Sequence, residues 1–327
     1  MYNEFFGLQR SPFNMTPDPA FLFLTGQHRE ALAGLSYAII QKKGFVVLTG
    51  DAGTGKTTLL AKVLTSIPPN LVQFSLIFNP KLTASEFLEM ALLDFGMRGI
   101  PGSKPQRLAS LHTFLLDGQA ARKSTVLIVD EAHQLSAEVL EEIRLLGNFE
   151  YADQKLLQIV LVGQSELDGM LDREDLRQFK QRIALRLSIE PLSKGEIEEY
   201  LKYRWTKAGG TLPLPFTEGA MLAIGKWSRG IPRVINAICD NALMLAFGED
   251  SSGVDVRQVA MVAKDLRLSE LTSESAPSSA PPPALLAITG SAPSHPLTMH
   301  TLERYETDAT RPSLLKRWAG RFGLVGV

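Results

Sequence analysis

A glycine-rich loop interrupts an apolar stretch early in the chain. Residues 45–49, FVVLT, form a β-branched and aromatic run typical of a buried strand, and residues 58–60 begin a helix. Between them lies GDAGTGKT at 50–57, a complete G-x-x-x-x-G-K-[ST] pattern. In this strand–loop–helix context the pattern predicts a loop that holds a nucleoside triphosphate, rather than a merely flexible glycine-rich turn.

The residue types of the loop suit this chemistry. The glycines allow positive φ and close backbone approach, so successive N–H groups can converge on a phosphate at a helix N-terminus. Lys56 is expected to reach the β- and γ-phosphates, and the Thr57 hydroxyl to ligate Mg²⁺. The residues predicted to surround the phosphates are Gly50, Asp51, Ala52, Gly53, Thr54, Gly55, Lys56, Thr57 and Thr58.

Composition narrows the class of protein. A chain of 327 residues with 45% hydrophobic residues can bury one large core or two modest ones. The formal net charge of −1 argues against a strongly basic nucleic-acid binder, and the single cysteine, Cys239, rules out an internal disulfide framework. Because neither a signal peptide nor an 18-residue apolar span appears, we expect a cytoplasmic protein, with peripheral attachment at the inner membrane as an option.

The apolar pattern predicts two folded parts and a tail. Strands expected at 71–78, 125–129, 156–162 and 185–189 alternate with helices, which indicates an α/β domain over 1–190 with a parallel sheet covered on both faces. Residues 191–268 contain helices only and are expected to form a four-helix lid, entered through a Ser193–Glu196 capping box. A second capping box is expected at Thr83–Glu86.

The two ends of the chain have unusual compositions. Residues 1–27 are rich in aromatics and prolines, so they should form an extended flap rather than a regular helix or central strand; the flap either contacts adenine or only covers the core. Residues 269–310 are rich in Ser, Pro, Ala and Thr and are predicted to be a disordered linker. The basic segment 311–327 is expected either to form an amphipathic helix that docks on a membrane or partner, or to be unstructured.

Two acids follow the apolar run TVLIV at 125–129. Asp130 is predicted at a strand C-terminus beside the phosphate loop, where it can hold the water shell of Mg²⁺, and Glu131 can polarise the attacking water. An acidic helix N-cap would explain one acid more readily than two. His133 is interpreted as a packing or hydrogen-bonding residue rather than a metal ligand, since no second His or Cys lies at ligand spacing.

Three further polar residues are candidates for reading the γ-phosphate. Gln164 follows the fourth strand, where its amide could reach the phosphate or orient water. Arg182 precedes the last strand, far from its own loop, and could act as an arginine finger in a neighbouring subunit; Arg177 and Arg186 are alternatives, as is a surface salt bridge. Arg233 opens a lid helix, where a cation opposes the helix dipole and so suggests an external anion as its partner.

Several stretches together resemble one branch of the AAA+ ATPases. The residues YNEFFGLQRSPFNMTPDPAFLFLTGQHREAL, VLIVDEAHQLS, LLQIVLVGQSEL, LRQFKQRIALRL and GIPRVINAICDNAL are similar to the general secretion pathway protein A (ExeA/GspA) family. The resemblance covers residues 1–268 and implies a RecA-like core with a helical lid. It also implies Lys56 and Thr57 as Walker A, Asp130 and Glu131 as Walker B, Gln164 as sensor 1, Arg182 as the finger and Arg233 as sensor 2.

The resemblance implies a ring-forming homo-oligomer that uses ATP and Mg²⁺ to help assemble a protein complex of the envelope, in a secretion or pilus system. The alternative is a DNA-associated AAA+ regulator of the transposition-module type. In that case either Lys180, Arg182 and Arg186 or Lys202, Arg204 and Lys207 would line a pore. The sequence contains no guanine-selective Asn-Lys-x-Asp stretch, which favours adenine.

Overall fold

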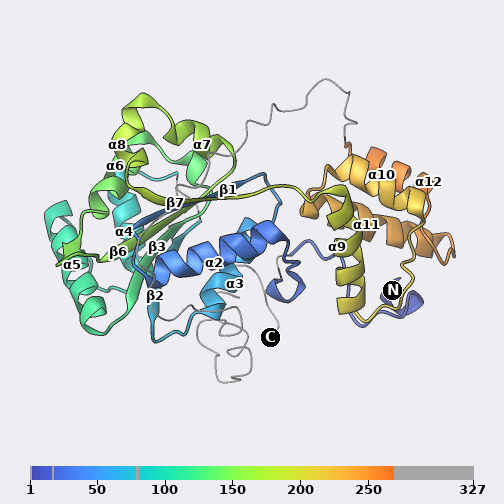
Figure 1. The fold of residues 1–327 in the computed structure, drawn as a ribbon, viewed down its shortest axis with the longest axis horizontal. Coiled ribbons are helices and arrows are strands. Elements are labelled where there is room, and N and C mark those ends of the chain that lie inside the picture. The colour runs from blue at the N-terminus through green and yellow to red at the C-terminus, as the bar shows by residue number, and fades with distance from the viewer. Residues whose placement is uncertain (1, 17, 79–80, 269–327) are drawn as a thin grey trace, which may run out of the picture.

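The structure, a computed structural model, describes residues 2–16, 18–78 and 81–268 (Figure 1). The expected linker over 269–310 and the expected basic helix in 311–327 lie outside the described residues.

Five parallel strands form the central sheet. They are β1 (Phe45–Gly50), β2 (Val72–Ile77), β3 (Ser124–Val129), β6 (Leu157–Val162) and β7 (Ile183–Ile189). Their spatial order is β2-β3-β6-β1-β7 and every neighbouring pair is parallel. The predicted α/β fold with a parallel sheet is therefore confirmed.

The strands are buried on both faces because helices cover each side. Side chains of one parity, such as Val47, Leu127 and Ile159, pack with α4 (Ala84–Asp94), α5 (Lys104–Ala120) and α6 (Ala137–Leu146). The other parity, such as Val46 and Val126, packs with α2 (Gly26–Ile40) and α3 (Lys56–Ser66). This double burial explains why the strands appear in the sequence as continuous apolar runs.

Both predicted capping boxes are confirmed, at Thr83–Glu86 and at Ser193–Glu196. Between β6 and β7 the chain forms α7 (Glu166–Leu171), a 3₁₀ turn (Glu174–Leu176) and α8 (Arg177–Lys180).

After β7 the chain crosses to a group of helices with its own hydrophobic cluster (Figure 1). These helices are α9 (Lys194–Lys207), α10 (Glu218–Ser228), α11 (Pro232–Gly248) and α12 (Val256–Asp265). The flap contributes Leu8, Phe13 and Phe21 to this same cluster, although the sequence grouped it with residues 1–190. The domain boundaries themselves stay a prediction.

Two local features differ from expectation. The flap begins with one turn of helix, α1 (Tyr2–Phe5), which is possible because the first proline comes only at residue 12. A two-residue hairpin, β4 (Glu150–Tyr151) and β5 (Gln154–Lys155), precedes β6 and was not predicted. Its turn places Ala152 at a φ of 51°, a left-handed conformation for which glycine or asparagine, rather than alanine, is the usual sequence signal.

Candidate nucleotide-binding site

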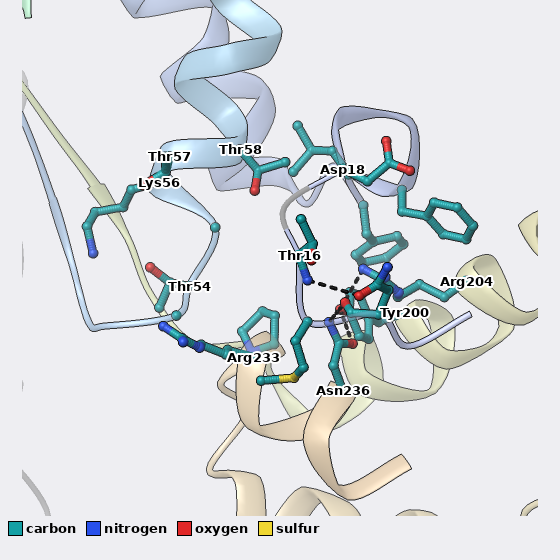
Figure 2. Close-up of a pocket in the computed structure, with 18 of the residues that line it drawn as sticks. Thr16, Asp18, Thr54, Lys56, Thr57, Thr58, Tyr200, Arg204, Arg233 and Asn236 are labelled. Atoms are coloured by element: carbon teal, nitrogen blue, oxygen red, sulfur yellow. Dashed lines mark hydrogen bonds between the residues drawn. The ribbon is translucent and has the colours of Figure 1, made fainter. Parts of the chain in front are cut away.

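A pocket of about 290 Å³ lies where the phosphate loop meets the flap and the helices α9 and α11 (Figure 2). Loop residues 52–58 line one end of it. In Figure 1, β7 runs towards the helical group, so the C-terminal ends of the strands face that group. This is the edge at which ligands bind in open parallel sheets.

The loop has the backbone that convergent N–H groups require. Gly53 and Gly55 have φ values of 86° and 102°, and Gly55 is the N-cap of α3 without any side-chain cap. The first N–H groups of α3 are therefore open to an anion. Gly50 must lack a side chain for a different reason, because a Cβ there would lie 2.2 Å from the carbonyl oxygen of Ile189.

The ammonium group of Lys56 folds back onto its own loop. Its Nζ donates to the carbonyls of Gly50 at 2.6 Å and of Asp51 at 2.9 Å. Burial lowers the pKa of Lys56, with Asp130 and Glu131 acting in the opposite direction. A phosphate oxygen in the pocket would offer this buried cation a charged partner in place of two neutral carbonyls.

The structure brings Thr57 and Asp130 together, although 73 residues separate them. The Thr57 hydroxyl donates to Asp130 Oδ2 at 3.1 Å, and the Glu131 N–H donates to Oδ1 at 2.9 Å. Burial raises the pKa of Asp130, because the carboxylate loses water. A hydroxyl and a buried carboxylate side by side are oxygen ligands of the kind that Mg²⁺ prefers.

Two donors surround the second acid. Glu131 has a left-handed backbone with φ of 54°, and its side chain is 42% exposed and lines the pocket. The Gln164 Nε2 amide donates to Glu131 Oε2 at 3.4 Å, and His133 Nε2 lies 3.5 Å from the same oxygen. Because His133 Nδ1 accepts from the Gln164 N–H at 3.3 Å, the neutral ring carries its proton on Nε2, towards Glu131.

Arg233 lies against the loop from the helical side. Its N–H donates to the Gly53 carbonyl at 3.2 Å, and its side chain lines the pocket and extends beside Thr54 in Figure 2. A Cβ at Gly53 would approach the Arg233 Cβ to 2.7 Å.

Arg182 does not join this group. It precedes β7, at the N-terminal end of the strands and therefore at the far end from the pocket. Its guanidinium donates to the Arg144 carbonyl at 3.1 Å and to the Asn148 side chain, at the end of α6. Of its two competitors, Arg186 pairs with Asp168 at 3.1 Å, and Arg177 is exposed.

The two sets of cations suggested for a DNA-lined pore are largely engaged within the chain. Lys180 pairs with Asp172 at 2.8 Å and Lys202 with Glu198 at 2.6 Å. Arg204 is buried, with its Nε donating to the Pro12 carbonyl at 2.5 Å.

The sequence did not single out several residues that line the pocket. His28, at the start of α2, is buried; its Nδ1 lies 2.7 Å from the Thr25 hydroxyl and its Nε2 lies 3.4 Å from the Thr54 carbonyl. Tyr200 donates to Asn236 Oδ1 at 2.7 Å, which joins α9 to α11 at the far end of the pocket. A polar residue within an apolar helical stripe was the only signal that could have found Tyr200 or Asn236.

Comparison with known proteins shows the family to which the chain is related. Residues 39–171 match the family model of an AAA domain. General secretion pathway protein A of Aeromonas hydrophila is 40% identical over 270 residues, which are 81% of this chain and 48% of that protein. The chain is an AAA+ protein related to general secretion pathway protein A. It spans about half the length of that curated relative.

Solved structures show the same fold for this AAA+ protein. Cdc6p from Pyrobaculum aerophilum is 17% identical, with a TM-score of 0.59 over 76% of this chain and 70% of its own. The Aeropyrum pernix ORC1 protein, solved in complex with DNA, is also 17% identical, with a TM-score of 0.59 over 79% of this chain and 69% of its own. At this identity the likeness concerns the fold alone. Within the described residues, no helix combines the length and apolar character needed to cross a membrane.

Proposed function

We propose that this AAA+ protein binds and hydrolyses ATP with Mg²⁺ and uses the energy to assemble or remodel a protein complex. The observation that carries the proposal is the 3.1 Å hydrogen bond from Thr57 to the buried Asp130, directly behind an open helix N-terminus. Few arrangements other than a metal–triphosphate site need a glycine loop, a buried lysine and a buried acid at one point.

The side chains divide the work. The loop N–H groups and Lys56 would hold the phosphates, and Thr57 and Asp130 would hold Mg²⁺, which neutralises charge on the phosphate oxygens. Glu131 would accept a proton from the attacking water, with its carboxylate held by Gln164 and His133. Arg233 would contact the γ-phosphate from the helical side, so that residues 191–268 act as a lid.

We further propose that Arg182 serves a neighbouring copy in a ring. Its place at the opposite edge of the sheet from the loop supports action in trans, since it cannot reach its own pocket without leaving the end of α6. The relation to general secretion pathway protein A supports a secretion-related client at the inner membrane.

Phosphate release tests the catalytic part of the proposal. We expect the full chain to release phosphate from ATP only with Mg²⁺, and the Lys56→Ala variant to show no release above background. Equal release by both proteins would contradict the proposal. A second experiment, cross-linking to the Glu131→Gln variant with bound ATP, identifies the client. Secretion-complex proteins should be enriched relative to the Lys56→Ala variant.

A further inference from the structure

Basic residues precede three neighbouring strands at the N-terminal ends of the strands, which lie opposite the pocket. Lys42 and Lys43 precede β1, Arg122 and Lys123 precede β3, and Lys155 ends the hairpin before β6. These strands are consecutive in the sheet, in the order β3-β6-β1. We call these five residues the strand-start cations.

Hydrogen bonds show that the loops carrying them form one surface. Lys42 donates to the Gln119 side chain, and the Gln119 amide donates to Gln154 Oε1 of the hairpin at 3.2 Å. A methyl group added at Gly44 would lie 3.5 Å from Lys155 Cγ. The cations of β1, β3 and β6 are therefore neighbours in space.

Helix termini explain only part of this charge. The C-terminal ends of α2 and α5 lie just before these cations, and each end carries roughly half a negative charge. One cation per helix, Lys42 and Arg122, would offset that. Lys43 and Lys123 are additional. The hairpin carries two acids, Glu150, which pairs with Lys155 and offsets its charge, and the exposed Asp153, so the excess positive charge of this surface comes mainly from Lys43 and Lys123.

Exposed apolar side chains flank the cations. Tyr37 is 55% exposed, with the Lys43 ammonium 5.4 Å from its ring centre, and Tyr151 on the hairpin is 58% exposed. Leu71 is 42% exposed directly before β2, where its carbonyl accepts from the Ser124 N–H. The strand-start cations together with Tyr37, Leu71 and Tyr151 make up what we call the strand-start surface.

We propose that the strand-start surface docks the protein on a bilayer of anionic phospholipid. Lysine and arginine bind the lipid phosphates, tyrosines favour the headgroup level, and a leucine gains by entering the acyl boundary. Duplex DNA would match the cations, but its phosphates offer nothing to the exposed leucine. The surface lies at the far ends of the strands from the pocket, so the inference does not rest on the proposed ATPase.

Vesicle sedimentation of the full chain tests this docking. We expect binding to phosphatidylcholine vesicles that contain phosphatidylglycerol, weakened by salt, and little binding to phosphatidylcholine alone. Reversing Arg122 and Lys123 together (Arg122→Glu/Lys123→Glu) should lower the partition coefficient by roughly 30-fold or more, since each basic residue near such a surface contributes about fivefold. The matched control, Lys207→Glu/Lys264→Glu on α9 and α12, should stay within about twofold.

Two further variants keep the test sharp. Tyr151→Ser leaves the charge unchanged and should lower the partition coefficient several-fold, and Lys56→Ala should bind vesicles like the wild type. An unchanged thermal melt of each variant confirms folding. Undiminished vesicle binding by Arg122→Glu/Lys123→Glu would overturn the proposal. So would equal binding to neutral vesicles, or a duplex DNA that displaces the protein from vesicles and loses affinity in the same double variant.

Discussion

The backbone N–H of Arg233 donates to the carbonyl of Gly53 at 3.2 Å, which seats the first turn of α11 on the phosphate loop. Pro232 begins this helix and cannot donate from its own nitrogen, so the N–H of Arg233 is the first one available. The conformation of the glycine-rich loop and the position of the helical group are therefore connected at Gly53.

Substitution of Gly53 by alanine should weaken nucleotide binding by about tenfold or more. The new Cβ would lie 2.7 Å from Arg233 Cβ and force α11 off the loop. Gly96→Ala is a matched control, because Gly96 also has a positive φ, of 87°, but nothing lies within 4 Å of its added Cβ. Both variants lose similar backbone freedom. Titration of a fluorescent ATP analogue measures the difference, and equal affinities would contradict the coupling.

Substitution of Glu131 or of the donors around it should slow hydrolysis without loss of ATP binding. Glu131→Gln should lower kcat by on the order of 100-fold or more, as expected for a lost general base. His133→Ala and Gln164→Ala should each lower kcat by about tenfold. Because both side chains hold the same carboxylate oxygen, the double variant should lose less than the product of the single losses. Strictly multiplicative losses would show that the two residues act separately.

Arg182 tests action between subunits. Arg182→Ala should lose most of its ATPase rate, by a factor on the order of 10³ for a true finger, yet regain rate when mixed with Lys56→Ala subunits. Because Arg182 also bonds the end of α6, a thermal melt must accompany the assay. Arg177→Ala is measured alongside it, since Arg177 is the competing exposed arginine. If Arg177→Ala loses the rate and Arg182→Ala keeps it, the finger is Arg177.

Asp130 makes stability depend on pH in the absence of ligand. Burial raises its pKa in the folded protein, so its contribution to stability is fully present below its unfolded pKa and is lost as pH rises through the folded pKa. We therefore expect Asp130→Asn to raise Tm by a few degrees at pH 7, at about 2–4 °C per kcal/mol, with less effect towards pH 4. It should also abolish any rise in Tm caused by Mg²⁺ with ATP. Asp117→Asn, at an exposed position of α5, should change neither value.

Much of the fold could be predicted because each strand and helix is determined by the residues within it and directly beside it. The strands differ from the predicted ones by two residues or fewer at each end, since runs such as TVLIV are buried on both faces and lie between clear breaks. The hairpin at 150–155 escaped prediction because two-residue strands leave no periodicity. The flap was recognised as irregular, but its packing against α9–α12 depends on contacts with residues nearly 200 positions away.

The fold class follows from the sequence alone, and so does the prediction of a glycine-rich loop at one end of the pocket. Residues 50–58 are contiguous, and Asp130 and Glu131 follow a strand whose end must meet the loop's edge in any parallel sheet. The folded structure was needed to show that Arg233 rests on Gly53, that His133 faces Glu131, and that Arg182 lies at the end of α6. It alone also gathered five cations at the opposite edge. Motifs encode backbone geometry over a few residues, whereas these contacts depend on how helices and loops distant in sequence pack around the sheet.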